Sequence, residues 1–189
     1  MPTKGRERYT REFLKVQPGE RVLDIGCGPG DILSVLPDDV QYVGVDLSPS
    51  YIKKAQAKFG SRGTFLCCAV DAVNPDEIGG KFDLAMANGV VHHLNDDEAK
   101  ALFRLSATKL KPDGRFCSFD GCFTEKQHWF ARWMLRNDRG RFVRKQPAYE
   151  ALAATAFSSV NATIVHDLTN IPYTHIILEC RNPLDASAR

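Results

Sequence analysis

Short apolar runs alternate with stretches of helical spacing between about residue 20 and residue 120. The apolar runs have the length and composition of buried strands, and they span residues 21–25, 41–46, 64–68, 82–87 and 114–120. Between them, Ser48 followed by Pro49 and Asn95 followed by Glu98 are signals that begin helices. This alternation predicts an α/β fold in which helices connect the strands of a parallel sheet.

The pattern changes after Asp120. Residues 121–145 are rich in aromatic and basic side chains, and residues 147–157 form an alanine-rich helical pattern. Two strand patterns follow in residues 160–180, and their short connection near Thr169 requires them to pair antiparallel. One domain of residues 1–181 is therefore predicted, divided into segments 1–19, 20–120, 121–157 and 158–181, with residues 182–189 as a loose tail.

Composition narrows the class of protein. The chain has 189 residues, 43% of them hydrophobic, and its formal net charge of +2 supplies no strong field for nucleic acid or a membrane surface. It contains no apolar run long enough to span a membrane, and its first residues lack the apolar core of a signal peptide. The six cysteines have no metal-ligand spacing, so no metal site is predicted. A cytoplasmic protein with reduced thiols is expected.

A glycine-rich turn, VLDIGCGPG at residues 22–30, follows the first predicted strand. Glycines let the backbone approach a ligand closely, and a following helical segment offers free N–H groups, which indicates a nucleotide-like ligand at the carboxyl ends of the strands. The dinucleotide pattern GxGxxG is absent, because the sixth position from Gly26 is Asp31, whose charge would repel a pyrophosphate. A phosphate-binding GK[ST] sequence is absent as well.

Polar side chains follow the next strands. Asp46 ends the second strand, where a carboxylate can accept both hydroxyls of a ribose. Asp71 and Ala72 follow the third strand, where they could meet an adenine amino group, and Asn88 follows the fourth. A ligand with ribose and adenine but no phosphate suits these groups, and S-adenosylmethionine is such a ligand.

These motifs resemble those of class I S-adenosylmethionine-dependent methyltransferases of the small-molecule kind, which include the type 11/12-like families. The matching pieces cover roughly residues 10–120 and are VLDIGCGPG at 22–30, VGVDLS at 43–48, VDA at 70–72, FDLAMANGVVHHL at 82–94 and LKPDGRF at 110–116. The resemblance implies a three-layer Rossmann-like fold. Its seven-stranded, mostly parallel sheet would have the order 3-2-1-4-5-7-6, with strand 7 antiparallel and a small helical insertion after strand 5.

The resemblance also implies roles for individual residues. Asp24, Gly26, Cys27, Gly28 and Asn88 would lie along the methionine part, Asp46 would hold the ribose, Leu47 would flank the adenine, and Asp71 and Ala72 would meet its edge. Tyr9 and Arg11 lie in the N-terminal helical segment 1–19, which often forms a lid over the cofactor in this family. Segment 20–120 would be the cofactor-binding core. As alternatives, a GxGxG sequence can form a tight turn only, and a strand-end Asp can cap a helix.

Methyl transfer is an in-line displacement in which much of the work is positioning the acceptor, and a base is needed only when the acceptor must lose a proton. His93 in the loop after the fourth strand and Asp120 at the end of the fifth are the catalytic candidates. For each, a structural role is the alternative: a loop histidine bonded to backbone, or a cap for the next helix.

The insertion 121–157 is predicted to choose the substrate. Arginine pairs bidentately with carboxylate or phosphate, and aromatic walls hold an apolar or sugar-like body. The predicted substrate-binding residues are His128, Trp129, Arg132, Arg136, Arg139 and Tyr173. Two alternatives stay open: the aromatic residues Trp129, Phe130 and Trp133 as a helix's buried stripe with the arginines on its solvated face, and a basic surface that docks RNA.

The sequence thus predicts a methyltransferase that moves a methyl group to an O or N atom of a small, anionic metabolite by proximity and orientation. Its partners would be the acceptor alone, with neither nucleic acid nor membrane insertion, and its oligomeric state is left open. The residues after the fourth strand, Asn88-Gly-Val-Val, differ from the element of base-methylating enzymes. The alternatives are a non-catalytic binding protein of this fold, an RNA methyltransferase and a nicotinamide-dependent oxidoreductase.

Overall fold

The computed structural model describes residues 1–74, 76, 79–137 and 140–184. A mostly parallel sheet forms its centre, with strands in the order β3-β2-β1-β4-β5-β8-β7 and a short strand, β6, paired to β5 off this path. The strands are β1 (Arg21–Ile25), β2 (Gln41–Val45), β3 (Gly63–Leu66), β4 (Phe82–Asn88), β5 (Leu110–Phe123), β6 (Arg144–Lys145), β7 (Phe157–Val165) and β8 (His175–Pro183).

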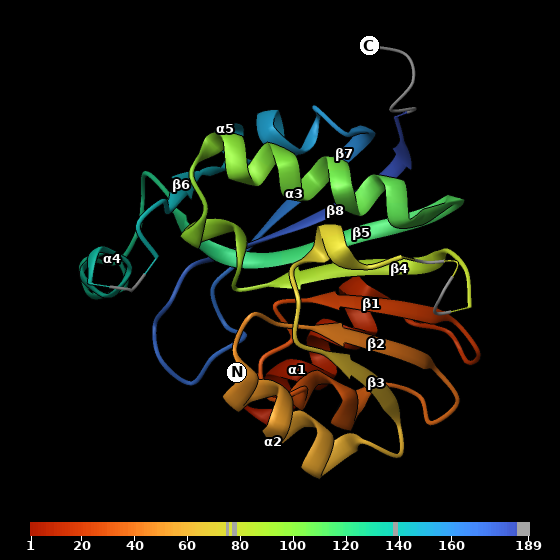
Figure 1. The fold of residues 1–189 in the computed structure, drawn as a ribbon. Coiled ribbons are helices and arrows are strands. Elements are labelled where there is room, and N and C mark those ends of the chain that lie inside the picture. The colour runs from red at the N-terminus through yellow and green to blue at the C-terminus, as the bar shows by residue number, and fades with distance from the viewer. Residues whose placement is uncertain (75, 77–78, 138–139, 185–189) are drawn as a thin grey trace.

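The predicted topology is confirmed. Strands β1 to β5 run parallel, and β8 inserts antiparallel between β5 and β7, which gives the expected order once the two-residue β6 is set aside. The carboxyl ends of β1 to β5 therefore meet along one edge of the sheet, called the carboxyl edge below. In Figure 1 this edge lies on the left.

Helices cover both faces of the sheet (Figure 1). They are α1 (Thr3–Tyr9), α2 (Pro49–Phe59), α3 (Asp96–Lys109) and α5 (Gln146–Ala153), while α4 (Trp129–Arg136) lies beyond the carboxyl edge. Buried side chains of α3 and α5 form one core with the sheet, and those of α1 and α2 form a second core on the opposite face. Both predicted helix starts have their caps, because the Ser48 side chain accepts from the backbone N–H of Tyr51 and Asn95 forms a capping box with Glu98.

Strand β5 is longer than predicted at both ends. The sequence Lys111-Pro-Asp-Gly does end α3, at Lys109, but the chain pairs with β4 at once, since Leu110 lies opposite Phe82 before a register shift. The turn signal thus marks an irregularity within the strand rather than a loop. At the other end, β5 continues past Asp120 to Phe123, which places Asp120 inside the strand.

Other boundaries also move. The helical segment predicted from Asp31 is a 3-10 turn, Asp31–Val35, and α5 ends before the chain enters β7 at Phe157. Strand β8 extends to Pro183, so the expected tail begins later than residue 182. Residues 185–189 of that tail lie outside the described residues.

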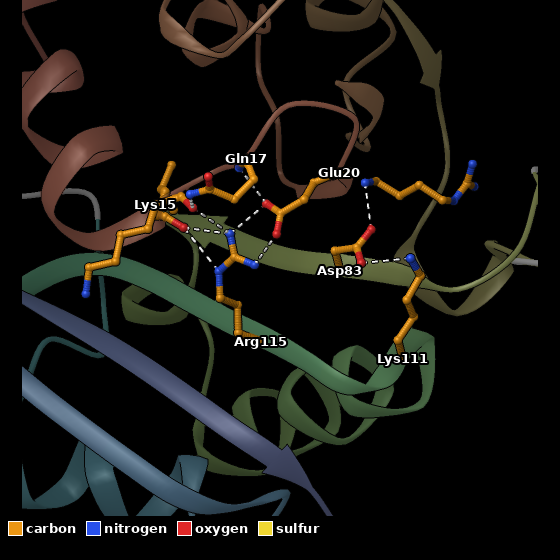
Figure 2. A network of polar contacts seen from close by, with 8 residues as sticks. Lys15, Gln17, Glu20, Asp83, Lys111 and Arg115 are labelled. Carbon is orange, nitrogen blue, oxygen red and sulfur yellow. Dashed lines mark hydrogen bonds and ion pairs between the residues drawn. The ribbon is translucent and has the colours of Figure 1, made fainter. Parts of the chain in front are cut away.

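A polar network at the opposite edge of the sheet fixes the N-terminal segment (Figure 2). The Arg115 guanidinium donates to both carboxylate oxygens of Glu20, at 2.8 Å each, and to the carbonyl oxygens of Leu14 and Lys15. Because Arg115 is on β5, these bonds hold the segment after α1 against the sheet. Helix α1 is thereby directed toward the carboxyl edge.

Candidate cofactor and acceptor site

The glycine-rich turn after β1 gives the backbone an open approach at one position. Gly26, Gly28 and Gly30 all have positive φ angles, of 71°, 54° and 73°. A Cβ on Gly28 would meet nothing within 4 Å, whereas one on Gly30 would lie 3.0 Å from the Phe65 ring. Gly28 therefore leaves space for a ligand, and Gly30 serves the packing of the turn.

Asp46 joins the end of β2 to this turn. Its Oδ2 accepts from the Gly28 N–H at 2.9 Å, and its Oδ1 accepts from the Ser48 N–H at 2.8 Å. Each carboxylate oxygen has two acceptor sites, so further donors can be bound from the cavity that Asp46 lines. The carboxylate is thus held in place and still able to accept the hydroxyls of a sugar.

A cavity of about 590 Å³ lies at the carboxyl edge beside Asp46. It is lined by the predicted site residues Leu47, Asp71 and His93, and α3 contributes the apolar side chains of Ala101, Leu102 and Leu105 together with Glu98. Ala72 does not line it, although its N–H bonds to Asp71 Oδ1 at 3.0 Å. Lining residues that the sequence analysis did not name include Tyr51, Val90, Leu94 and Leu102.

A second cavity of about 310 Å³ lies on the other side of the glycine turn. It brings together four predicted residues from separate parts of the chain: Tyr9, Asp24, Cys27 and Asn88. The two cavities share Gly26, Gly28 and Gly89, so they adjoin at the ends of β1 and β4. An elongated ligand bent around the glycine turn could occupy both.

Asp24 is a buried carboxyl group that lacks a hydrogen-bond partner for one of its two oxygens in the described structure. It is 2% exposed, and Tyr42 donates to its Oδ2 at 2.6 Å, while its Oδ1 is buried with no hydrogen-bond partner in the described structure. Burial raises its pKa to about 7, although the Tyr42 hydrogen bond opposes the rise, and the nearby Asp46 carboxylate adds to it. A cationic ligand group in the smaller cavity would donate a hydrogen bond to Asp24 Oδ1 and would favour the charged form of the Asp24 carboxylate.

Tyr9 closes the smaller cavity from α1. Its hydroxyl donates to Asn88 Oδ1 at 2.7 Å and lies 3.3 Å from Cys117 Sγ. Burial raises the pKa of Tyr9 well above its ordinary value, so the phenol stays protonated at neutral pH. The tyrosine therefore positions the Asn88 amide rather than acting as a base.

The structure does not bring Arg11 to either cavity. Its side chain is 70% exposed and pairs with Glu12. Arg6 lines the smaller cavity instead, and its Nε is buried with no hydrogen-bond partner in the described structure. Helical spacing could have found it, because Arg6 is three residues before Tyr9 and shares its face, whereas Arg11 follows Tyr9 by two.

The catalytic candidates lie in different surroundings. His93 is exposed and lines the larger cavity. Asp120 lines neither cavity: it is 1% exposed, and its Oδ1 accepts from the His92 backbone N–H at 3.1 Å and lies 2.8 Å from His92 Nδ1. Asp120 thus holds the turn Val91–His93 that precedes it along the chain, instead of capping a following helix. The His92 ring contacts the His93 ring, with centroids 4.2 Å apart.

Helix α4 exposes its aromatic residues. Trp129 is 73% exposed and Trp133 is 57% exposed, whereas Ala131 and Leu135 are buried. The alternative that the tryptophans belong to a buried stripe is therefore wrong. The apolar residues Ala131 and Leu135 face the protein, which leaves the opposite side of a short helix to the large rings.

The other predicted substrate residues surround α4. Arg132 is half-buried and Arg136 is exposed, while exposed His128 accepts from the Phe130 N–H at 3.3 Å and begins the helix. The Tyr173 hydroxyl lies 2.9 Å from the point where a Cβ on Gly121 would stand. Arg139 lies outside the described residues.

Arg144, part of the same basic segment, has a structural role. Its guanidinium donates to the carbonyl oxygens of Val91 and Leu94 and to Asp96, and its side chain is 9% exposed. It therefore fixes the loop between β4 and α3 next to His93. The sequence alone does not distinguish an arginine that bonds the protein's own backbone, as Arg144 does, from one that could bind a substrate.

The sheet order, with helices on both faces, defines a Rossmann-like fold, and the paired cavities lie at its carboxyl edge. Residues 22–114 match the family model described as a methyltransferase domain, and this confirms the resemblance to class I S-adenosylmethionine-dependent methyltransferases. The solved structure of magnesium protoporphyrin IX methyltransferase from Synechocystis PCC 6803, with bound S-adenosylhomocysteine, has a TM-score of 0.63 and 21% identity. The alignment covers 87% of this chain and 74% of that one.

Two curated relatives are similar over part of the chain. The malonyl-[acyl-carrier protein] O-methyltransferase of Legionella pneumophila is 38% identical over 84 residues, which are 43% of this chain and 29% of the relative. Phosphoethanolamine N-methyltransferase 1 of Arabidopsis thaliana is 33% identical over 127 residues, 62% of this chain and 25% of the relative. The chain thus matches less than a third of either relative's length.

None of the helices in the described part of the chain combines the length and the apolar character needed to cross a membrane.

Proposed function

We propose that this chain transfers a methyl group from S-adenosylmethionine to an O or N atom of a small, anionic acceptor. The observation that carries the proposal is the pair of adjoining cavities at Gly26, Gly28 and Gly89. One offers a fixed carboxylate of the kind that holds a ribose, and the other a buried carboxylate oxygen without a partner. These features fit the two ends of the same cofactor.

The larger cavity would hold the adenosine part. Asp46 would accept the ribose hydroxyls with the sites left free by Gly28 and Ser48. Leu47 and Val90 line the cavity and would flank the adenine ring, and Asp71 would meet its edge. The apolar wall from α3 would exclude water from the base.

The smaller cavity would hold the methionine part. The Asp24 carboxylate would accept hydrogen bonds from the cofactor's ammonium group. The Arg6 guanidinium, which lies 4.0 Å from the Asp31 carboxylate, would pair with the carboxylate of the cofactor. When bound, the cofactor supplies a methyl carbon attached to a sulfonium sulfur, which leaves as a neutral thioether when the methyl group is transferred. Tyr9 and Asn88 would fix the position of that end of the cavity, so that an acceptor beside Gly89 and His93 is held close to the reacting carbon.

The basic surface at the carboxyl edge supports an anionic acceptor. Arg132 and Arg136 project from α4, and the Arabidopsis relative acts, by its name, on phosphoethanolamine, a phosphorylated amine. We propose the same division of the chain as the sequence suggests: segment 1–19 as lid, 20–120 as cofactor-binding core, 121–157 as substrate insertion and 158–181 as closing hairpin.

Asp46→Ala tests the ribose role directly. Each charge-assisted hydrogen bond is worth about 1.5–3 kcal/mol, so the affinity for S-adenosylhomocysteine, measured by calorimetric titration, should fall at least about 10-fold. Asp38→Ala is the matched control, because the Asp38 side chain is 99% exposed, pairs with Arg62 and lines neither cavity. Equal affinities of the two variants would contradict the assigned role of Asp46.

Turnover distinguishes an enzyme from a binding protein. Release of S-adenosylhomocysteine should be measured with phosphoethanolamine and with other small phosphorylated and carboxylated acceptors. Methylation of any of them supports the proposal. Tight cofactor binding with no turnover across the panel would instead favour the non-catalytic alternative.

A further inference from the structure

Most of the exposed large hydrophobic residues in the described part of the chain lie at the carboxyl edge, and Leu184, at the opposite edge, is an exception. Leu47 and Tyr51 are exposed at the carboxyl edge but line the larger cavity, so the proposed cofactor would cover them. Other exposed large hydrophobic residues border neither cavity. Those in the segments after β5 and between β7 and β8 are Trp129, Trp133, Phe142 and Ile171. An exposed apolar group of this kind, concentrated beside a site, is typical of an interaction surface.

Helix α4 presents its two tryptophans outward from a fixed base. In Figure 1 it stands apart from the sheet, beyond the carboxyl edge. Its inner face is anchored, because Leu135 and Tyr173 both approach the same point above Gly121, at 2.7 and 2.9 Å. Trp129 and Trp133 are one helical turn apart on the opposite face. The exposure of the rings is therefore set by the packing of the helix.

Cations flank the tryptophans. Arg132 and Arg136 are on α4 itself, and Lys126 and Arg141 are exposed in the adjoining segments. Among the residues that the structure describes, no carboxylate forms an ion pair with Arg132 or Arg136. Guanidinium groups pair with phosphate and carboxylate, so Arg132 and Arg136 suit a partner that carries such anions.

We propose that α4 docks the carboxyl edge on an anionic membrane surface and presents the site to a lipid head group. Indole rings favour the boundary between acyl chains and head groups, and arginine side chains pair with anionic phosphates beside them. The identity of the acceptor as a head group rests on the proposed function, but the docking surface does not. The outward indoles favour a lipid surface over RNA, whose binding requires a longer row of phosphate contacts.

The two tryptophans of the chain are both on α4, so intrinsic tryptophan fluorescence reports on this helix alone. With vesicles of phosphatidylglycerol and phosphatidylcholine, the emission should shift to shorter wavelength and be quenched by brominated lipid, while pure phosphatidylcholine should have little effect. Arg132→Gln with Arg136→Gln should weaken vesicle binding about 25-fold at low salt, since one cation near an anionic surface contributes about fivefold. The Trp129→Ala, Trp133→Ala variant should lose binding in a sedimentation assay.

Controls remove comparable groups elsewhere. Lys53→Gln with Lys54→Gln deletes two exposed cations on α2, and Leu184→Ala shortens an exposed apolar side chain after β8. Both should bind vesicles as the unsubstituted protein does, and the α4 variants should keep their affinity for S-adenosylhomocysteine. If neither the unsubstituted protein nor any variant bound S-adenosylhomocysteine, the proposed function would be refuted, but the vesicle-binding result would still support docking.

Three results would overturn the docking proposal: no vesicle binding, equal losses in the control variants, or retention of binding without the tryptophans. It would also fail if the α4 variants lost affinity for single-stranded RNA while vesicles had no effect, or if Trp129→Ala, Trp133→Ala only converted a dimer to a monomer in sedimentation velocity.

Discussion

At the scale of single residues, the Asp24 carboxyl group lies where its charge is costly, and the proposed function requires that charge. Burial raises its pKa to about 7, far above the usual value for an aspartate. Between about pH 4 and pH 7 the unfolded chain releases this proton while the folded chain retains it, so folding stability falls as pH rises. Above pH 7 the penalty is complete. The ligand-free protein therefore carries a destabilised group at the proposed cofactor site.

Asp24→Asn should remove this pH dependence. The amide keeps an acceptor for the Tyr42 hydroxyl but has no charge to bury. Relative to the unsubstituted protein, the free energy of unfolding should rise by roughly 2 kcal/mol between pH 5 and pH 8, measured in urea. At pH 8 the variant should bind S-adenosylhomocysteine more weakly, because the ammonium group loses a carboxylate partner. A stability difference that is the same at both pH values would contradict the buried-charge explanation.

Sequence reasoning located residues whose position depends on one strand end. Asp46 and Gly28 both line the larger cavity, and they are bonded to each other across 18 residues. The pairing of His92 with Asp120 was not predicted, and Arg11 was expected at the cofactor site where the structure places Arg6. These depend on which side of a strand or helix faces the cavity, and strand-end position alone does not fix that.

At the scale of elements, the segment that follows α1 is fixed at the opposite edge of the sheet, while α1 itself reaches the site. The chain after it is bonded by Arg115, and the Tyr9 hydroxyl then meets Asn88 at the end of β4. Figure 2 shows that Arg115 and Lys111 both extend from β5 into this network, but toward different partners. The Arg115 contacts at Leu14 and Lys15 and the proposed lid at Tyr9 thus belong to one short segment.

Arg115→Ala should release the N-terminal segment without unfolding the sheet. The lost bonds involve a charged group, so local opening should increase about 10-fold or more, measured as trypsin cleavage after Arg6, Arg8 or Arg11. Affinity for S-adenosylhomocysteine should fall as well. Lys111→Ala is the matched control, because Lys111 bonds Asp83 at 2.7 Å and does not contact the N-terminal segment. Equal cleavage rates in the two variants would show that Arg115 does not hold the N-terminal segment.

Elements were predicted best where one periodicity applied throughout. The alternation of strands and helices gave the parallel sheet, and the capping signals at Ser48 and Asn95 gave the starts of α2 and α3. The length of β5 was underestimated because Pro112 and Gly114 read as a turn, although Leu110 already pairs with β4. The exposure of α4 was open, since its aromatic residues suit either a core or a surface.

At the scale of the whole molecule, ligand binding should be visible as stability. At 100 times its dissociation constant, a ligand that binds only the folded state adds about 2.7 kcal/mol. S-adenosylhomocysteine should therefore raise the thermal midpoint by about 5–10 °C, measured by differential scanning fluorimetry. NAD at the same concentration should produce no shift, and a shift with NAD alone would favour the oxidoreductase alternative.

Because β8 runs antiparallel, Leu184 lies at the sheet edge opposite the cavities, whereas Met1 lines the smaller cavity. Any polypeptide fused ahead of Met1 would emerge beside the proposed methionine site. A fusion after the last strand would emerge far from it. For purification, immobilisation or fluorescent labelling, the attachment point should therefore be at the C-terminal side, so that the handle itself does not compete with the cofactor.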